Sequence, residues 1–229
     1  MKAIFRFLSA VCLMVVLYAN ANAQGTGIEI TSKMTSPMMG GNPMPMVVDI
    51  KGDKAVTTMN NPMGEMKVYT DNSTHKTVLV MGGKTGYEVD AKKAEELAAA
   101  KKDSIVPVAT GQKKTINGYN CELYTATSSD ADFEMWMTSD FPKDITEAMK
   151  KFSSGGGIGG MRGGKANPFG SLMEKGLAPV QTDVKNKGQL MASIEFVKYE
   201  RKSLDDAMFI VPSDVTIQPM PAMMGGQGK

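Results

Sequence analysis

The stretch MVVDIKGDKAVTTMN, residues 46–60, contains a structural pattern that recurs through most of the chain. Alternate residues from Met46 to Ile50 are apolar, which places them on one face of a half-buried β-strand. The turn that follows at 51–54 contains Gly52, which can adopt the positive φ of a tight hairpin. A second strand begins directly after this turn, so the stretch predicts an antiparallel hairpin.

Short strands of the same kind, separated by polar turns, recur at spacings of roughly ten residues. The predicted strands are residues 28–34, 46–51, 55–60, 65–70, 76–81, 85–89, 115–116, 119–127, 132–138, 178–185 and 189–202. This order is typical of an antiparallel meander, so we expect one large sheet. The composition shows no break that would divide the chain and no repeat that would indicate a solenoid.

Three helices interrupt the predicted sheet. Residues 91–102 are rich in Ala, Lys and Glu and have a thin apolar side, which favours a helix on the surface. A second helix, 142–152, begins at Pro142 and carries an apolar stripe at helical spacing. A third, short helix starts at Asn167–Pro168 and is stopped by Gly176. The predicted fold class is therefore α+β, a curved antiparallel sheet with about three helices.

The chain begins with the features of a secretory signal peptide, residues 1–23. Lys2 and Arg6 precede an apolar run, and Ala21–Asn22–Ala23 is a small-residue cleavage signal, so we expect cleavage before Gln24. The apolar run is shorter than the roughly 20 residues that span a bilayer. The mature protein is therefore predicted to be periplasmic or secreted.

The mature chain is predicted to form one domain, residues 24–217, followed by a disordered tail at 218–229 that is rich in Pro, Met and Gly. A flexible glycine-rich loop, 153–166, connects the second and third helices. Its Gly159-x4-Gly164-Lys165 is one residue short of a phosphate-binding loop, and Ala166 lacks the hydroxyl that would hold Mg²⁺. We therefore interpret the loop as a connector.

Composition excludes several classes of function. Removal of the signal peptide takes two of the 26 basic residues and none of the 24 acidic ones, so the mature chain has no formal net charge. A nucleic-acid binder is normally basic, and no later segment is apolar enough to be a transmembrane helix. Only Cys121 remains of the two cysteines, which excludes an internal disulfide. It lies in a strand pattern, where a buried inert thiol is expected and a reactive thiol is the alternative.

Catalytic and zinc chemistry find little support in the sequence. The chain has one histidine, His75, which lies in a polar turn, and it has no Gly-x-Ser-x-Gly motif. One histidine and one cysteine cannot form a clustered zinc site. We therefore expect a protein that is not an enzyme and that needs no cofactor.

Methionine is the unusual residue of this chain, with 21 in total, two of them in the signal peptide. Most are dispersed over strand and helix faces beside other apolar residues, which suits an adaptable apolar surface. One cluster is dense, and its soft thioethers could hold Cu(I). It contains Met38, Met39, Met44 and Met46.

Two segments resemble a known family. Residues 116–124, INGYNCELY, contain the pattern GY-x-C-x-x-Y, and they are followed by Met135-Trp136-Met137-Thr138. With the hairpin at 49–54 and the closing segment 204–212, they resemble the secreted bacterial "domain of unknown function 4412" family. The closing segment is also similar to that of the LolA/LolB lipoprotein carriers. The resemblance covers residues 25–217, and the glycine-rich loop and the many methionines depart from it.

The resemblance implies an incomplete antiparallel β-barrel wrapped around helices, with an apolar cavity that takes acyl chains in the carriers. We expect the same cavity here, holding a lipid or another hydrophobic molecule. Its predicted lining is Met66, Val68, Phe133, Met135, Met137, Ile145, Met149, Phe152, Phe169, Leu172, Ile194 and Phe196. A periplasmic Cu(I)-binding protein and an envelope structural protein without a ligand are the alternatives. The partner protein in the envelope is unknown.

Overall fold

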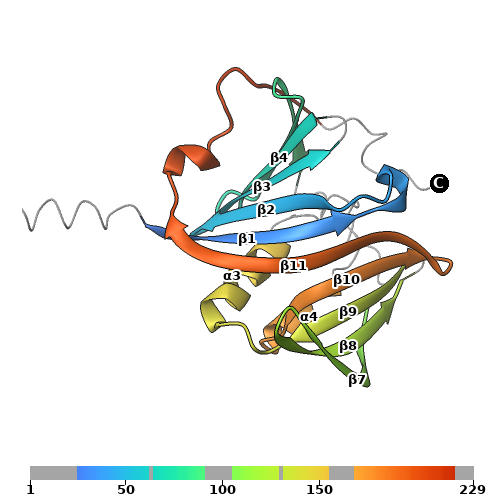
Figure 1. Ribbon diagram of the computed structural model, residues 1–229. Coiled ribbons are helices and arrows are strands. Elements are labelled where there is room, and N and C mark those ends of the chain that lie inside the picture. Colours follow the sequence, from blue (N-terminus) through green and yellow to red (C-terminus); the bar gives the residue numbers. More distant parts are fainter. Residues whose placement is uncertain (1–24, 62–63, 91–104, 129–130, 155–167, 220–229) are drawn as a thin grey trace, which may run out of the picture.

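The computed structural model describes residues 25–61, 64–90, 105–128, 131–154 and 168–219 (Figure 1). The strands are β1 (Thr26–Thr35), β2 (Met44–Lys51), β3 (Lys54–Asn61), β4 (Gly64–Asp71), β5 (Lys76–Met81), β6 (Thr85–Asp90), β7 (Val108–Ile116), β8 (Tyr119–Thr127), β9 (Asp132–Thr138), β10 (Ala178–Asn186), β11 (Gln189–Ser203) and β12 (Thr216–Pro219). The α-helices are α3 (Lys143–Ser154) and α4 (Gly170–Glu174), and the 3₁₀ helices are η1 (Pro37–Met39) and η3 (Asp206–Phe209).

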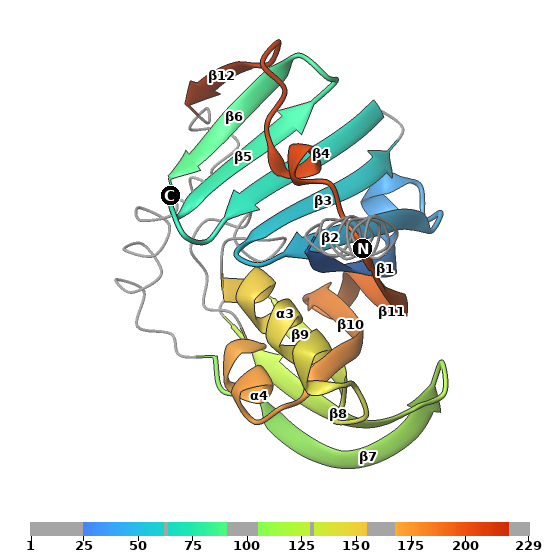
Figure 2. The same cartoon turned by 90° about the vertical axis from the view of Figure 1, so that its left-hand side faces the viewer.

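All twelve strands belong to one open sheet, in the order β12-β6-β5-β4-β3-β2-β1-β11-β10-β9-β8-β7. Two meanders, β1–β6 and β7–β11, are joined where β1 pairs with β11. The sheet curves so that α3 and α4 lie on its inner side, between the two meanders (Figure 2). The predicted curved sheet is thus present as a mostly β, twelve-stranded sheet that does not close.

The prediction of a wholly antiparallel sheet is wrong at one edge, where β12 runs parallel to β6. After β11 the chain crosses the outer face of the β1–β6 half, and Figure 2 shows this segment passing over β3 and β4. Leu204, Phe209 and Val215 pack there against Val56 and Tyr69, among other buried residues. This burial carries the chain to the far edge of the sheet, where β12 forms.

Several predicted boundaries change. Strand β7 begins at Val108, seven residues before the predicted start, and α3 ends at Ser154, inside the predicted loop 153–166. Strand β12 includes two residues of the tail predicted at 218–229. The signal peptide, the predicted helix at 91–102 and most of the glycine-rich loop lie outside the described residues.

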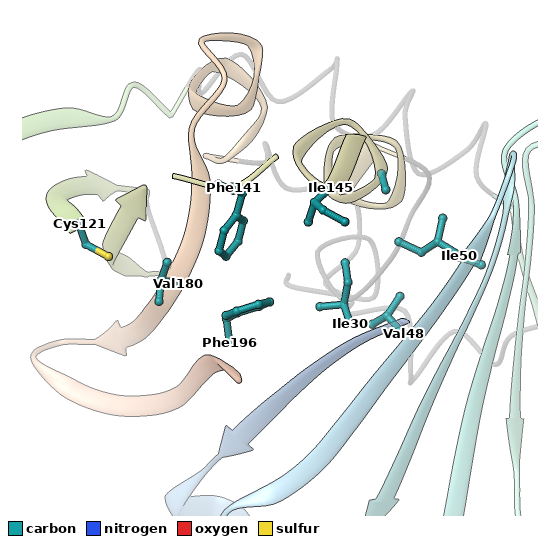
Figure 3. Close-up of a cluster of buried hydrophobic side chains, with 11 residues drawn as sticks. Ile30, Val48, Ile50, Cys121, Phe141, Ile145, Val180 and Phe196 are labelled. Atoms are coloured by element: carbon teal, nitrogen blue, oxygen red, sulfur yellow. The ribbon is translucent and has the colours of Figure 1, made fainter. Parts of the chain in front are cut away.

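The core between sheet and helix forms around residues far apart in sequence. Figure 3 shows Ile145 of α3 directed toward the space where Ile30 of β1 and Phe196 of β11 lie. Phe196 is in turn packed against Phe141, with ring centroids 4.7 Å apart. Aromatic pairs of this kind stabilise a core beyond the area that they bury, so Phe196 is part of the packed core beside the helix.

Candidate functional site

A cavity of about 420 Å³ lies on the inner side of the sheet, next to this core. Its floor comes from β1, β2, β10 and β11, and its other walls from η1, β9, α3 and α4. The lining residues are Ile30, Ser32, Met34, Ser36, Met38, Met46, Val48, Phe133, Met149, Phe152, Ser153, Phe169, Met173, Pro179, Val180, Thr182, Val184, Met191, Ala192, Ile194 and Phe196. The volume lies in the range of small-molecule sites, roughly 300–1,000 Å³.

The cavity wall is uncharged. No Asp, Glu, Lys, Arg or His is among the described residues that line it. Its polar groups are four hydroxyls, which belong to Ser32, Ser36, Ser153 and Thr182. The remaining wall is apolar, and six of its side chains are methionines, whose unbranched thioethers adapt to different shapes. The chemistry of the wall therefore suits an apolar ligand.

Six of the twelve predicted cavity residues line this cavity. They come from β9, α3, the start of α4 and β11, and they are Phe133, Met149, Phe152, Phe169, Ile194 and Phe196. Strand alternation placed Ile194 and Phe196 on one face, and helical spacing brought Met149 and Phe152 together. Whether these residues contact a ligand remains a prediction.

The other six predicted residues do not line it, because they lie in other parts of the sheet–helix interior. Met135 and Met137 pack with Leu172 in a closed cluster between β9 and α4, and none of the three is more than 1 % exposed. Ile145, on the inner face of α3, is fully buried in the main core. Val68 and Met66 lie on β4, three strands away from β1 in the sheet. Five of the six are core residues; Met66 is half-buried.

The prediction missed the part of the wall supplied by β1, β2 and β10. The alternation of Ile30, Met34, Met46 and Val48 was visible in the sequence, because each lies at an even position of a strand pattern. The missing information was strand adjacency. Strand β1 pairs with β11, more than 150 residues away along the chain, and no local pattern encodes that pairing.

A row of methionines crosses the same inner face of the sheet. Met46 lies opposite Met59, Met59 opposite Met66, and Met66 opposite Met81, on the neighbouring strands β2 to β5. Directly opposite residues of antiparallel strands point to the same side. Met46 lines the cavity and Met59 is buried, so the row continues the methionine-rich floor under the β1–β6 half.

Of the four methionines of the Cu(I) alternative, Met38, Met44 and Met46 lie in different surroundings. Met38 is 78 % exposed on η1, whereas Met46 is 5 % exposed inside the cavity. Met44 is half-buried at the start of β2, opposite Met34. The backbone of Met39 ends η1. Among the described residues, no group of three or more His, Cys, Asp or Glu is placed to hold a metal ion.

One edge of the cavity is held by a buried serine. The Ser36 hydroxyl, which precedes η1, donates a 2.8 Å hydrogen bond to the carbonyl of Met191 at the start of β11. This bond ties the β1–β2 connection to the β10–β11 hairpin. The exposed Met38 lies next to it, so this edge of the cavity has a thioether that faces solvent.

The remaining candidate groups for chemistry lie away from the cavity. Cys121 is buried, its Sγ lies 3.4 Å from the carbonyl oxygen of Tyr119, and burial raises the pKa of its thiol. A raised pKa favours the neutral thiol, which is the less reactive form. His75 is exposed in the β4–β5 turn. In the described part of the chain, no helix has the length and apolar character needed to cross a membrane.

Comparison with known proteins gives a family match over most of the chain. The model of the family "Domain of unknown function (DUF4412)" matches residues 25–215. No curated protein matches the sequence.

Solved structures give distant matches. A structure of PNGF-II matches at 14% identity and a TM-score of 0.46, over 88% of this chain and 32% of that one. The chain thus spans about a third of the PNGF-II chain. A LolA superfamily protein from Nitrosomonas europaea matches at 9% identity and a TM-score of 0.33, over 82% of this chain and 90% of the other. A putative outer membrane lipoprotein-sorting protein domain from Vibrio parahaemolyticus matches at 10% identity and a TM-score of 0.34, over 86% and 95%.

Proposed function

The chain belongs to the family described as "Domain of unknown function (DUF4412)", and we propose that it is an exported binding protein, without enzymatic activity, that holds a lipid or another hydrophobic molecule in the cavity between its sheet and helices. The observation that carries this proposal is the uncharged wall of a cavity of about 420 Å³. A site for a charged substrate, or for a metal ion held by carboxylate or imidazole, would need Asp, Glu, Lys, Arg or His among the described lining residues.

The free energy of binding would come mainly from removal of apolar surface from water. Each buried CH₂ group of a ligand contributes about 0.8 kcal/mol. A chain of several such groups is therefore held without an ion pair. The flexible methionines of the wall would allow chains of different shape to fit, which rigid β-branched side chains would resist.

Two walls of the cavity support a binding role over a purely structural one. Phe196 is held by Phe141 and Tyr119, whereas α4 consists of five residues and ends at Gly176 through a left-handed turn. The cavity is thus bounded by a packed aromatic cluster and by residues of a helix of little more than one turn. The structural alternative requires an interior without free space beside Ile194 and Phe196, and this cavity argues against it.

Export follows from the predicted signal peptide and remains part of the proposal. A periplasmic or extracellular protein with one buried cysteine depends on packing for its stability. It would meet lipids and other apolar molecules of the envelope directly. Cell fractionation that detects a mature chain beginning at Gln24 would test this part.

The binding proposal is tested by filling the cavity. Ala192 lines the cavity on β11, whereas Leu190, two residues earlier on the same strand, does not and is 38 % exposed. We expect Ala192→Trp to reduce binding of a fluorescent fatty-acid probe at least tenfold and Leu190→Trp to leave it nearly unchanged. Native mass spectrometry of the purified wild-type protein should show a bound apolar molecule.

Two results would contradict the proposal. One is a wild-type protein that carries no ligand and binds neither the fluorescent fatty acid nor its uncharged methyl ester. The other is equal probe binding by the Ala192→Trp and wild-type proteins, because the indole would occupy the space assigned to the ligand. Thermal unfolding of both Trp variants would show that each is folded.

A further inference from the structure

Two of the four hydroxyls of the cavity wall hydrogen-bond to the protein, and two do not. Ser36 donates to the carbonyl of Met191, and Ser153 donates a 2.8 Å hydrogen bond to the carbonyl of Met149. No hydrogen bond joins the side chain of Ser32 or Thr182 to any residue in the described part of the chain. Both residues line the cavity, and they are only 6 % and 5 % exposed.

Neither hydroxyl oxygen is among the fully enclosed atoms without a partner in the described residues, so both are open toward the cavity, where water or a ligand can satisfy them. An apolar side chain would fit the rest of this wall better. The two positions therefore indicate that the molecule in the cavity brings its own hydrogen-bonding group.

Ser32 and Thr182 lie on β1 and β10, the two strands that flank β11 in the sheet. Ser32 on β1 is opposite Phe196 of β11, and Thr182 on β10 is opposite Ile194 of β11. Two strand spacings, about 10 Å, separate them across the sheet, and their partners on β11 are two residues apart, which adds an offset of about 7 Å along the strand. They thus offer two separate hydrogen-bonding positions on an apolar floor. A ligand can place a polar group at either position.

The charges nearest in sequence do not face the cavity. Lys33 follows Ser32, and Asp183 follows Thr182, so strand alternation directs both toward the outer face. Asp183 is already engaged there by the hydroxyl of Ser193 and the amide of Gln181. No cation among the described lining residues could balance a buried carboxylate or phosphate, whose burial unpaired is very unfavourable.

We propose that the cavity selects lipids whose buried polar group is uncharged, an alcohol or an ester, and that Ser32 and Thr182 are two separate positions at which such a group can be hydrogen-bonded. This inference rests on the proposed function, since it names the class of ligand for the same cavity. A hydroxyl can donate to an ester carbonyl and can also accept from an alcohol, so both kinds of lipid fit the same two positions.

The test uses four probes with similar chains: dodecane, dodecanol, methyl dodecanoate and sodium dodecanoate. Each displaces a fluorescent probe from the full mature protein at neutral pH. We expect the double variant Ser32→Ala/Thr182→Val to weaken binding of dodecanol and methyl dodecanoate by about three- to tenfold, as the loss of one hydrogen bond predicts, and the single variants to show which position holds each probe. Binding of dodecane should be unchanged, and wild-type protein should bind the carboxylate more weakly than its methyl ester.

Thr57→Val is the matched control, because Thr57 is also buried and unpartnered but does not line the cavity. It should leave binding of all four probes unchanged. The ligand-free Ser32→Ala and Thr182→Val proteins should be as stable as wild type, since neither hydroxyl makes a hydrogen bond that the substitution would remove. This separates a role in binding from a role in folding.

The outcomes distinguish this inference from the proposed function. If the variants lose affinity for dodecane as much as for dodecanol, or if the carboxylate binds as tightly as the ester, the two hydroxyls do not select a neutral lipid and the inference is wrong. Binding of all four probes without such selection would still leave the proposed function standing. Failure of every probe to bind would overturn both.

Discussion

Arg201 on β11 holds Asp144, in the first turn of α3, through two hydrogen bonds from its Nε and Nη2 to the two carboxylate oxygens, at 2.9 and 2.8 Å. Near the other end of α3, the Lys151 Nζ lies 3.1 Å from the Oδ1 of Asp53 in the β2–β3 turn. The backbone carbonyl of Lys151 accepts a hydrogen bond from the side-chain amide of Asn72. The helix that forms a wall of the cavity is therefore attached to the sheet near both of its ends.

We predict that the Arg201–Asp144 pair couples only weakly, because both side chains are about half exposed and exposed ion pairs are screened by solvent. A double-mutant cycle with Arg201→Ala and Asp144→Ala, followed by urea unfolding, would measure this coupling. It should shrink in high salt. The Arg201 hydrogen bond lowers the pKa of Asp144, so the coupling should be present at neutral pH and vanish as the pH falls through that lowered pKa. A coupling independent of salt and pH would contradict this.

The methionine row predicts that substitution of Met59 strongly affects stability. Met59 is 6 % exposed and lies between Met46 and Met66. Met59→Ala should lower the free energy of unfolding by about 2–5 kcal/mol, because it leaves a void in the buried face. Met59→Leu should cost less than about 1.5 kcal/mol, since its volume is similar. Met208→Ala, on the exposed side of η3, is the control and should have little effect. Equal stabilities of the Met59→Ala and wild-type proteins would mean that this face is not packed.

Gly27 is predicted to admit no larger residue, because the segment after β11 crosses directly over it. A Cβ at this position would lie against Leu204 and 2.9 Å from the backbone oxygen of Ile50. Gly27→Ala should therefore destabilise the protein by about 1–3 kcal/mol, as overpacking does. Gly170→Ala is the control, since a Cβ there meets nothing within 4 Å. Leu204→Ala should partly relieve the clash in a double variant, and absence of any rescue would contradict this packing.

Asp49 predicts a pH dependence of stability. Asp49 is buried on the outer face of β2, and its Oδ1 has no hydrogen-bond partner in the described residues. Burial raises the pKa of its carboxyl, and nearby Glu29 raises it further, whereas Lys202 lowers it. A raised pKa means that the folded state binds the proton more tightly. Stability should therefore fall as the pH rises from the ordinary aspartate pKa through the raised one.

Asp49→Asn should remove this pH dependence and raise the free energy of unfolding at neutral pH, because the amide carries no charge to bury. Urea unfolding across the acidic range would measure both effects. A variant that is less stable than wild type at neutral pH would instead mean that Lys202 stabilises the ionised carboxylate.

The Cu(I) alternative predicts a different result from the lipid proposal. Replacement of Met38, Met39, Met44 and Met46 by Leu removes every thioether of the cluster while nearly conserving volume. We expect the variant to keep its affinity for a fluorescent fatty acid within a few-fold of wild type. A Cu(I) titration of both proteins provides the comparison. Tight Cu(I) binding by wild type that is lost in the variant would favour the copper function.

Much of the fold was predictable because its signals are local. Alternation from Met46 to Ile50 and the turn at Gly52 predicted the β2–β3 hairpin, and the family resemblance predicted from residues 116–124 is confirmed by the match over residues 25–215. Half of the twelve predicted residues also reached the candidate site, through local spacing. Met149 and Phe152 share a helix face, and Ile194 and Phe196 share a strand face, so each pair reached the cavity together.

The sequence by itself determined which residues are apolar together, because strand and helix periods are properties of neighbouring residues. Only the tertiary structure decided which apolar faces enclose a space and which are filled. Met135 and Met137 were sealed by Leu172, whereas Ser32 and Thr182 were brought to one cavity by β11, which lies between their strands. The physical reason is that strand pairing joins segments far apart in the chain, and the packing that closes or leaves a cavity depends on those partners.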